Sequence, residues 1–454
     1  MCCLIASACV GSDVSSSSSQ LATAPAAAEP ASDAPGTTSV PTVAPTPIAV
    51  PTPLPTPQPT VTATPVPAPT PAPVCARPTE NVVAAPASVV AALEAAKQHP
   101  GFADFDVSAS VWVEGWGEVL TVQPDQQLTP ASNQKLLVAI AAHTLLDPAA
   151  RLRTSIELSG SDLVLRAAAD PTLTDSAINA LTNQVAAAGV TKADRLLIDV
   201  SAYPQAPRAA GWLDFQIPTY VGPLSGLMIA NNQWASSDEF LADPALLNGQ
   251  RVLSQLQEAG VDIESVEIDT APVGIAVAEH FSPTVSDLVG TALLRSDNQH
   301  ADLLLMELGR VLVGEGTLVA GAAAVDYVLG NLCLPTAATI DDGSGLSRDN
   351  QRSARQFQEM LRAVRGPVGD TVRSQLPVAG TSGTLSRRFA AADAGRVQAK
   401  TGTLLDARAL SGYATTDSGR DVVFSIIVNG EQGRVGQSVA AIDALVTAVL
   451  RIAS

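Results

Sequence analysis

The sequence predicts an α+β protein, because runs typical of strands and runs typical of helices alternate along most of its 454 residues. A helix is expected over 88–98, and a β-hairpin over 107–122, where valines alternate around a Gly115–Gly117 turn. The far end is predicted as three strands and a closing helix, over 396–402, 407–415, 421–429 and 436–452.

The middle of the chain has a different texture and is predicted as a separate unit. Short β-like runs alternate there with helical stretches. The runs are 155–158, 163–166, 195–200 and 265–269, and the helical stretches are 175–188 and 251–259. We therefore expect a smaller α+β domain at 151–282, inserted into a main domain made of 80–150 and 283–454.

The N-terminal residues carry features of export and of a spacer. Residues 1–9 end in Ala6-Ser7-Ala8-Cys9, a loose lipobox with Cys9 as the acylated residue, but a basic start and a full apolar run are missing. The segment is either a truncated lipoprotein signal or no signal. Residues 10–79 are rich in Ser, Ala, Pro and Thr, which predicts a disordered spacer, either an extended polyproline-like one or a linker of no specific reach.

Charge and cysteine usage exclude several classes of protein. A net charge of −18 argues against nucleic acid or an anionic membrane surface as a partner. No C-x-x-C pair occurs and the histidines lack ligand spacing, so we expect no metal site and no cofactor. Cys75 and Cys333 either form one disulfide or are two unpaired apolar residues. The apolar run Leu136–Leu146 is shorter than the roughly 20 residues that span a bilayer, which predicts a buried helix.

Three short patterns occur in one order: Ser132-Asn133-Gln134-Lys135, Ser296-Asp297-Asn298 and Lys400-Thr401-Gly402. Each alone is weak, since such patterns are usually a helix cap with a surface lysine, a turn, and a strand end. Lysine occurs at only four positions in the chain, so the ordered trio is unexpected by chance.

The first two patterns suit nucleophilic catalysis. Ser132 precedes a strongly apolar helical run, and Lys135 lies three residues further on the same face. A serine hydroxyl needs a base to take its proton, and a buried lysine with a lowered pKa supplies one. In the second pattern, Ser296 is expected to pass a proton to the leaving amine, and the Asn298 amide to hold a peptide carbonyl.

The third pattern lies on a predicted strand, 396–404, and suits recognition of an anion. Lys400 supplies a positive charge and Thr401 a hydroxyl for a substrate carboxylate, while Gly402 leaves room for the substrate backbone. The backbone N–H groups of Thr403 and Ser132 together form the expected oxyanion hole.

The trio is the signature of penicillin-binding proteins and serine β-lactamases. Five segments in sequence order resemble the class C low-molecular-mass penicillin-binding proteins, the D-alanyl-D-alanine carboxypeptidase/endopeptidase family, over about 85–454. They are 129–136, 170–173, 296–298, 342–348 and 376–380. The resemblance implies a transpeptidase/β-lactamase-like catalytic domain, an antiparallel sheet flanked by helices, in residues 80–150 and 283–454. Asp342–Ser347 is then either an active-site loop or an ordinary Gly-Ser-Gly turn.

The resemblance also implies the activity. The expected function is that of a serine-type, penicillin-sensitive D-alanyl-D-alanine carboxypeptidase/endopeptidase acting on peptidoglycan stem peptides through an acyl-enzyme, with β-lactams as inhibitors. Its expected location is extracytoplasmic, with a membrane contact only through a lipid anchor at Cys9. Two alternatives remain: a β-lactamase, for which no water-activating carboxylate is evident, and a non-catalytic peptidoglycan-binding or penicillin-sensing module. Replacing Ser132 separates an enzyme from a binder.

Overall fold

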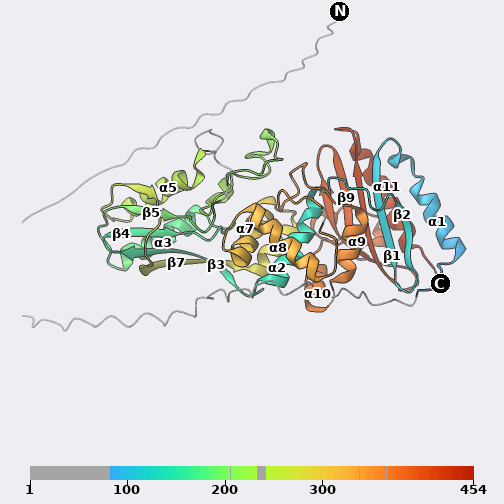
Figure 1. The fold of residues 1–454 in the computed structure, drawn as a ribbon, viewed down its shortest axis with the longest axis horizontal. Coiled ribbons are helices and arrows are strands. Elements are labelled where there is room, and N and C mark those ends of the chain that lie inside the picture. Colours follow the sequence, from blue (N-terminus) through green and yellow to red (C-terminus); the bar gives the residue numbers. More distant parts are fainter. Residues whose placement is uncertain (1–81, 205, 233–241, 337, 365, 454) are drawn as a thin grey trace, which may run out of the picture. The chain divides into compact units, whose positions relative to one another are not determined.

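The computed structural model describes residues 82–204, 206–232, 242–336, 338–364 and 366–453. Within them the first sheet has five strands in the order β2-β1-β10-β9-β8, every neighbouring pair antiparallel (Figure 1). Its strands are β1 (Asp106–Val113), β2 (Gly117–Val122), β8 (Val397–Thr403), β9 (Ala407–Thr415) and β10 (Asp421–Asn429). Because β1 pairs with β10, the beginning and the end of the described chain meet at the centre of this sheet.

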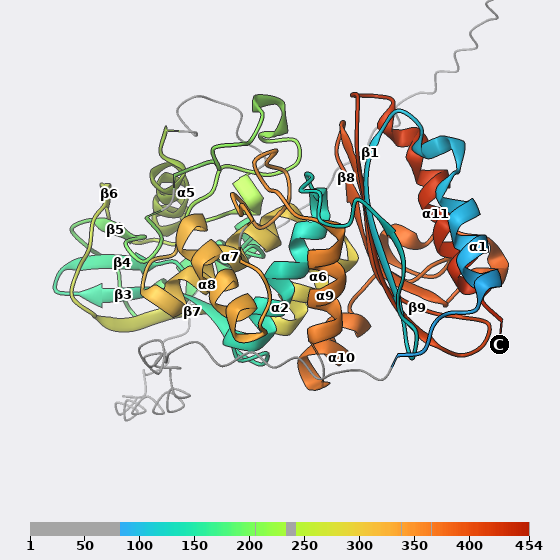
Figure 2. The ribbon, with the colours of Figure 1, turned by 45° about the vertical axis from the view of Figure 1, so that its right-hand side comes forward.

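Helices cover both faces of the first sheet. Helices α1 (Ala87–Lys97) and α11 (Ser438–Leu450) lie together on one face, and α9 (Ala354–Ala363) and α10 (Gly366–Ser374) lie on the other (Figure 2). Strand β10 therefore buries seven consecutive residues, Val422–Val428, instead of alternating buried and exposed positions. The strand is apolar for this reason, apart from the buried Ser425.

A layer of helices follows on the α9 side, and its members share one hydrophobic cluster with the sheet. Helices α2, α7 and α8 of this layer lie between the two sheets in both views (Figures 1 and 2). The helices are α2 (Lys135–Leu145), α6 (Val285–Leu294), α7 (Asn298–Val313), α8 (Leu318–Asn331), α9 (Ala354–Ala363) and α10 (Gly366–Ser374). Helix α2 is buried on every side from Lys135 to His143, which explains why its sequence is apolar all round.

The second sheet is mixed, with the order β6-β5-β4-β3-β7. Strands β4, β5 and β6 run parallel, whereas β3 is antiparallel to both β4 and β7. The strands are β3 (Arg151–Ser159), β4 (Asp162–Arg166), β5 (Leu196–Asp199), β6 (Val266–Ile268) and β7 (Ile275–Thr284). Helices α3 (Asp175–Ala187) and α5 (Pro244–Glu258) pack on it around a hydrophobic cluster whose buried members all lie between Ile156 and Ala278.

The predicted fold class is confirmed: the protein is α+β, with an antiparallel sheet flanked by helices. The inserted domain at 151–282 stays a prediction, although the second sheet occupies 151–284. The sequence patterns did not indicate β7, α6 or α8 to α10. The signal at 1–9, the spacer at 10–79 and Cys75 lie outside the described residues, whereas Cys333 is disulfide-bonded. Among the described helices, none is long and apolar enough to cross a membrane.

Two isoleucines on neighbouring strands of the second sheet test whether its core is essential. Ile156 on β3 is 0% exposed and Ile275 on β7 is 75% exposed. Ile156→Ala will lower the free energy of unfolding by about 2–5 kcal/mol, because a buried cavity remains. Ile275→Ala will lower it by less than about 1 kcal/mol. Urea unfolding of the full chain, followed by circular dichroism, measures both, and equal losses would contradict this assignment of the core.

Candidate active site

Ser132 lies in a short 3₁₀ turn, Ala131–Gln134, directly before helix α2. The predicted helix N-terminus is therefore preceded by one tighter turn, and α2 itself begins at Lys135. The Lys135 Nζ atom lies 3.0 Å from Ser132 Oγ, as the spacing of three residues predicts. Ala131 has a φ of 48°, so the chain enters this turn in a conformation that residues other than glycine rarely adopt.

Two glycines hold the backbone before Ser132 in a narrow gap. A Cβ added at Gly345 would lie 2.0 Å from the Ala131 carbonyl oxygen, and one added at Gly402 would lie 2.7 Å from the Pro130 carbonyl oxygen. Strand β8 therefore contacts the backbone of Pro130 through Gly402, and the 342–350 loop contacts that of Ala131 through Gly345. Glycine is required at both positions for the close approach.

The second motif joins the first through Asn298. Its Oδ1 accepts a hydrogen bond from Lys135 Nζ at 2.7 Å, and its Nδ2 donates to the Tyr220 carbonyl at 2.9 Å. Asp297 is the N-cap of α7 and accepts from the backbone N–H of His300, which fixes the start of the helix. The Asn298 amide therefore stands between helix α2 and the segment that links β5 to α5.

The third motif joins the second through Ser296. Lys400 on β8 donates from Nζ to Ser296 Oγ at 2.8 Å and to the Thr401 carbonyl at 2.9 Å. The Thr401 hydroxyl lies 2.7 Å from that of Thr384. Ser296 has a φ of 60°, a second strained residue at the point where the motifs meet. The three motifs thus form a closed set of contacts.

Both lysines are removed from water, whereas the hydroxyl groups are not. Lys135 is 1% exposed and Lys400 0% exposed. Ser132, Ser296 and Asn298 are half-buried, and Thr403 at the end of β8 is exposed. A molecule that approaches the site from solvent therefore meets the serine hydroxyls, the Asn298 amide and the end of β8 before it meets either amine.

Burial sets the charge of the two lysines. It lowers the pKa of Lys135 to about 8, although the carboxylates of Asp302, Asp342 and Asp297 act in the opposite direction. Burial also holds the pKa of Lys400 well below its usual range, and the charge of Lys135 adds to this effect. A lysine with a pKa near 8 is partly neutral at physiological pH, so its amine is able to accept a proton.

The loop 342–350 is part of the site and is more than a turn. The Ser344 carbonyl accepts a hydrogen bond from Lys135 Nζ. The carboxylate of Asp342 organises the loop by accepting hydrogen bonds at 2.7–3.0 Å from Trp212 Nε1, Ser344 Oγ, Gly345 N, Ser347 N and Asn350 Nδ2. The contact with Lys135 favours the active-site alternative for Asp342–Ser347, and a part for this loop in catalysis stays a prediction.

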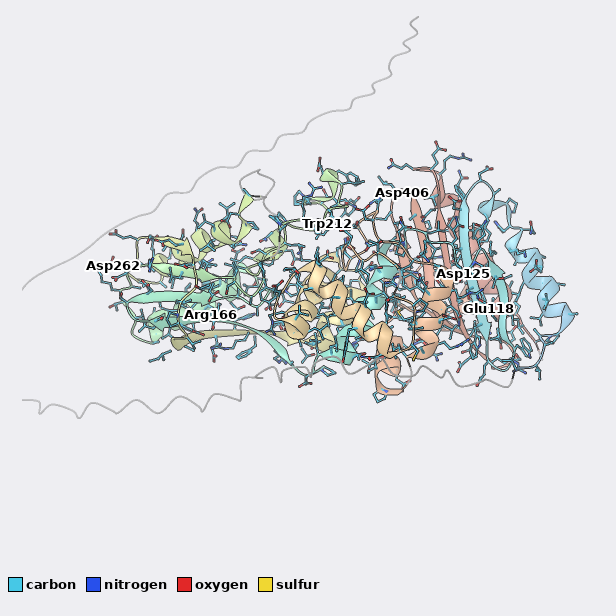
Figure 3. All side chains as sticks on the ribbon, in the orientation of Figure 1. Glu118, Asp125, Arg166, Trp212, Asp262 and Asp406 are labelled. Atoms are coloured by element: carbon cyan, nitrogen blue, oxygen red, sulfur yellow. The ribbon has the colours of Figure 1, made fainter. Side chains whose placement is uncertain are left out.

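The segment between β5 and α5 lies against the same loop. Trp212, labelled in Figure 3, reaches Asp342 with its indole N–H, and Gln216 Nε2 donates to the Leu346 carbonyl at 3.1 Å. Next to Asn298, the Gln299 side chain accepts from the Gly222 N–H at 2.8 Å. Residues of the segment between β5 and α5 therefore hold both the loop and the start of α7.

The structure brings together all the residues that the sequence indicated: Ser132, Lys135, Ser296, Asn298, Lys400, Thr401, Gly402 and Thr403. Their roles in catalysis stay predictions. The sequence analysis missed Asp302, the Ser344 carbonyl, Thr384 and the Tyr220 carbonyl. Asp302 could have been found, because an acidic residue inside the apolar run Ala301–Leu305 is unusual. Backbone carbonyls, in contrast, are not visible in a sequence.

Known proteins are similar to this chain in sequence and in fold. The model of the D-Ala-D-Ala carboxypeptidase 3 (S13) family matches residues 114–239 and 239–449. Carboxypeptidase DacB of Mycolicibacterium smegmatis is 32% identical over 77% of this chain and 79% of its own length. Penicillin-sensitive carboxypeptidase A of Dictyostelium discoideum is 32% identical over 42% of this chain and 39% of its own. Penicillin binding protein 4 of Haemophilus influenzae shares the fold, with a TM-score of 0.71 at 20% identity, over 80% of this chain and 99% of its own.

Gly345→Ala tests the close approach of the loop to Ala131. Gly345 and Gly419 have similar φ angles, +81° and +78°, but a Cβ at Gly419 meets no heavy atom within 4 Å. Gly419→Ala therefore costs only the backbone strain, about 1 kcal/mol. Gly345→Ala adds a clash with backbone and will cost at least about 2 kcal/mol more. Urea unfolding compares the two variants. Equal free energies of unfolding would show that the loop accommodates the added methyl group without loss of stability.

Proposed function

Because this chain belongs to the D-Ala-D-Ala carboxypeptidase 3 (S13) family and is a serine-type D-alanyl-D-alanine carboxypeptidase, we propose that Ser132 is its nucleophile and Lys135 its base. The observation that supports this most is the contact of 3.0 Å between Ser132 Oγ and the amine of Lys135, a fully buried lysine. A buried amine with a lowered pKa is the group that a serine hydroxyl needs to become a nucleophile.

Acylation proceeds by transfer of one proton and exchange of one bond. Lys135 takes the Ser132 proton as Oγ bonds to the carbonyl carbon of the penultimate D-Ala. The C–N bond to the terminal D-Ala, or to the amine of a cross-link, then breaks. The proton that Lys135 took then passes to the leaving nitrogen through the hydroxyl of Ser296, which lies between the motifs and accepts a hydrogen bond from Lys400. Water hydrolyses the resulting ester and returns the hydroxyl to Ser132.

Substrate binding falls to the third motif and to Asn298. Lys400 and the Thr401 hydroxyl provide positive charge and a donor for the terminal carboxylate, and Gly402 leaves room for the peptide. The backbone N–H groups of Ser132 and Thr403 stabilise the oxyanion that forms during acylation. Asn298 holds a substrate carbonyl with the amide hydrogen that the Tyr220 carbonyl does not take.

The substrate is the stem peptide of peptidoglycan, and β-lactams are inhibitors that acylate Ser132. The name of the Dictyostelium discoideum relative, penicillin-sensitive carboxypeptidase A, supports this sensitivity. A peptidoglycan substrate also favours an extracytoplasmic location. Acylation of Cys9 and a spacer over residues 10–79 would then tether the catalytic domain to the membrane surface.

Benzylpenicillin is expected to form a covalent adduct with Ser132. After incubation of the full chain with benzylpenicillin, the intact mass will rise by one penicillin, and Ser132→Ala will stay unmodified. Mass spectrometry of both proteins, with D-Ala release from a peptide ending in D-Ala-D-Ala as the second readout, checks this. An unmodified parent with intact penicillin would favour a binding module. An unmodified parent with hydrolysed penicillin would favour a β-lactamase.

The rate of acylation is expected to depend on pH through the charge of Lys135. The neutral fraction of Lys135 rises with pH through about 8, so the rate of acylation by benzylpenicillin will rise between pH 6 and 9.5 with a midpoint near that value. Lys135→Arg keeps a positive charge that is not lost in this range, and it will acylate at least about 100-fold more slowly at every pH. Stopped-flow or quenched mass measurements provide the rates. A flat or falling profile for the parent would exclude Lys135 as the base.

A further inference from the structure

Asp302 is a carboxylate without solvent on helix α7, one turn after Asn298. It is 0% exposed and stands in an otherwise apolar run of the helix. Its Oδ1 accepts hydrogen bonds from two consecutive backbone N–H groups, Gly343 and Ser344, both at 2.8 Å. Its Oδ2 is buried and makes no hydrogen bond within the described residues. Removing a carboxylate from water costs free energy, and two hydrogen bonds alone offset only part of that cost.

These two N–H groups fix residue 344, whose carbonyl faces the active site. The N–H of Ser344 bonds to Asp302, and the carbonyl of the same residue accepts from Lys135 Nζ. The loop also rests directly on the α7 backbone, because a Cβ added at Gly343 would lie 2.5 Å from the Ala301 carbonyl oxygen. Asp302 therefore determines where the Ser344 carbonyl lies relative to the amine.

The number of acceptors around Lys135 matches the needs of a base. A neutral amine has two hydrogens and one lone pair. Asn298 Oδ1 and the Ser344 carbonyl are both acceptors without a proton of their own to donate, so they take the two hydrogens. The third neighbour is Ser132 Oγ at 3.0 Å, which leaves the lone pair of the neutral amine to accept from the Ser132 hydroxyl. Without the Ser344 carbonyl, a hydrogen of the amine would be free to turn toward Ser132.

We propose that Asp302 is a positioning residue of the acylation reaction, which holds the Ser344 carbonyl against Lys135 and thereby directs the lone pair of the amine at Ser132. This inference rests on the proposed function, in which Lys135 is the base. Its geometry does not depend on the charge of Asp302, since the carbonyl-type oxygen of a neutral acid accepts the same two N–H groups. Burial and the nearby Asp342 in fact raise the pKa of Asp302 well above its usual range.

Four variants of the full chain separate positioning from mere stability. Asp302→Ala removes the acceptor, and Asp302→Asn keeps an amide oxygen in its place. Gly343→Ala pushes the same loop away from α7 without a change at Asp302. Glu307→Ala is the matched control: a buried carboxylate on the same helix that bonds to Tyr203 and Arg310 and has no hydrogen bond to the loop among the described residues.

The measurement is the acylation of each variant by benzylpenicillin, resolved into the binding constant and the first-order rate constant, well below each melting temperature. We expect Asp302→Ala and Gly343→Ala to lower the rate constant at least about 30-fold with little change in binding. Asp302→Asn will stay within about fivefold of the parent, and Glu307→Ala will lose stability but keep its rate constant.

Three outcomes would overturn the proposal: a rate constant for Asp302→Ala within threefold of the parent, equal losses for the alanine and asparagine variants, or an equal loss for Glu307→Ala. If Asp302→Ala does not fold, Gly343→Ala beside Asp302→Asn decides the question by the same criteria. Failure of the proposed function is distinct from all of these, because the parent itself would then form no adduct.

Discussion

The removal of the Lys135 amine from water is the constraint on which the rest of this structure depends. A lysine in an apolar environment loses hydration that an ordinary surface lysine keeps, and this loss lowers its pKa to about 8. The amine stays in place only because Ser132, Asn298 and the Ser344 carbonyl surround it as partners. Every element around the site either excludes water from this amine or presents one of these partners.

Three distant parts of the chain have to meet for this to happen. Helix α2 supplies the lysine, the start of α7 supplies the amide, and β8 approaches the backbone before Ser132. Close contact between backbones is possible only where no Cβ intervenes. Gly343 of the 342–350 loop accordingly lies against Ala301, Gly345 of the same loop against Ala131, and Gly402 of β8 against Pro130. The same packing places Lys400 near Lys135, whose charge adds to the effect of burial and lowers the pKa of Lys400 further.

How much of this could be predicted from the sequence depends on the kind of group involved. Ser132 and Lys135 were predictable because helical spacing makes them neighbours, and β8 to β10 because their apolar runs are separated by clear turns. Strand β7 was not predicted. Its apolar Ile275 and Phe281 are exposed, whereas its buried positions hold the small residues Ala278 and Ser282, so hydrophobicity does not mark the buried face of this strand. The role of Asp302 could not be predicted, because it depends on a contact with a loop 41 residues further along the chain, which local sequence patterns do not reveal. The carbonyls of Ser344 and Tyr220 belong to the backbone and have no residue type to reveal them.

The pairing of β1 with β10 has a consequence for how the enzyme comes into being. Asn429 on β10 bonds through its side chain to the backbone of Thr129, a contact across 300 residues that anchors the segment leading to Ser132. Contacts of such long range form late, since the chain between them must first be closed into a loop. The second sheet, with a hydrophobic cluster of its own, has all its strands once residue 284 has emerged. We therefore expect the second sheet of the nascent chain to become resistant to protease early, which limited proteolysis of stalled chains would reveal. Ser132 is expected to become reactive only after the last strands have been synthesised, which penicillin labelling of the same stalled chains would reveal.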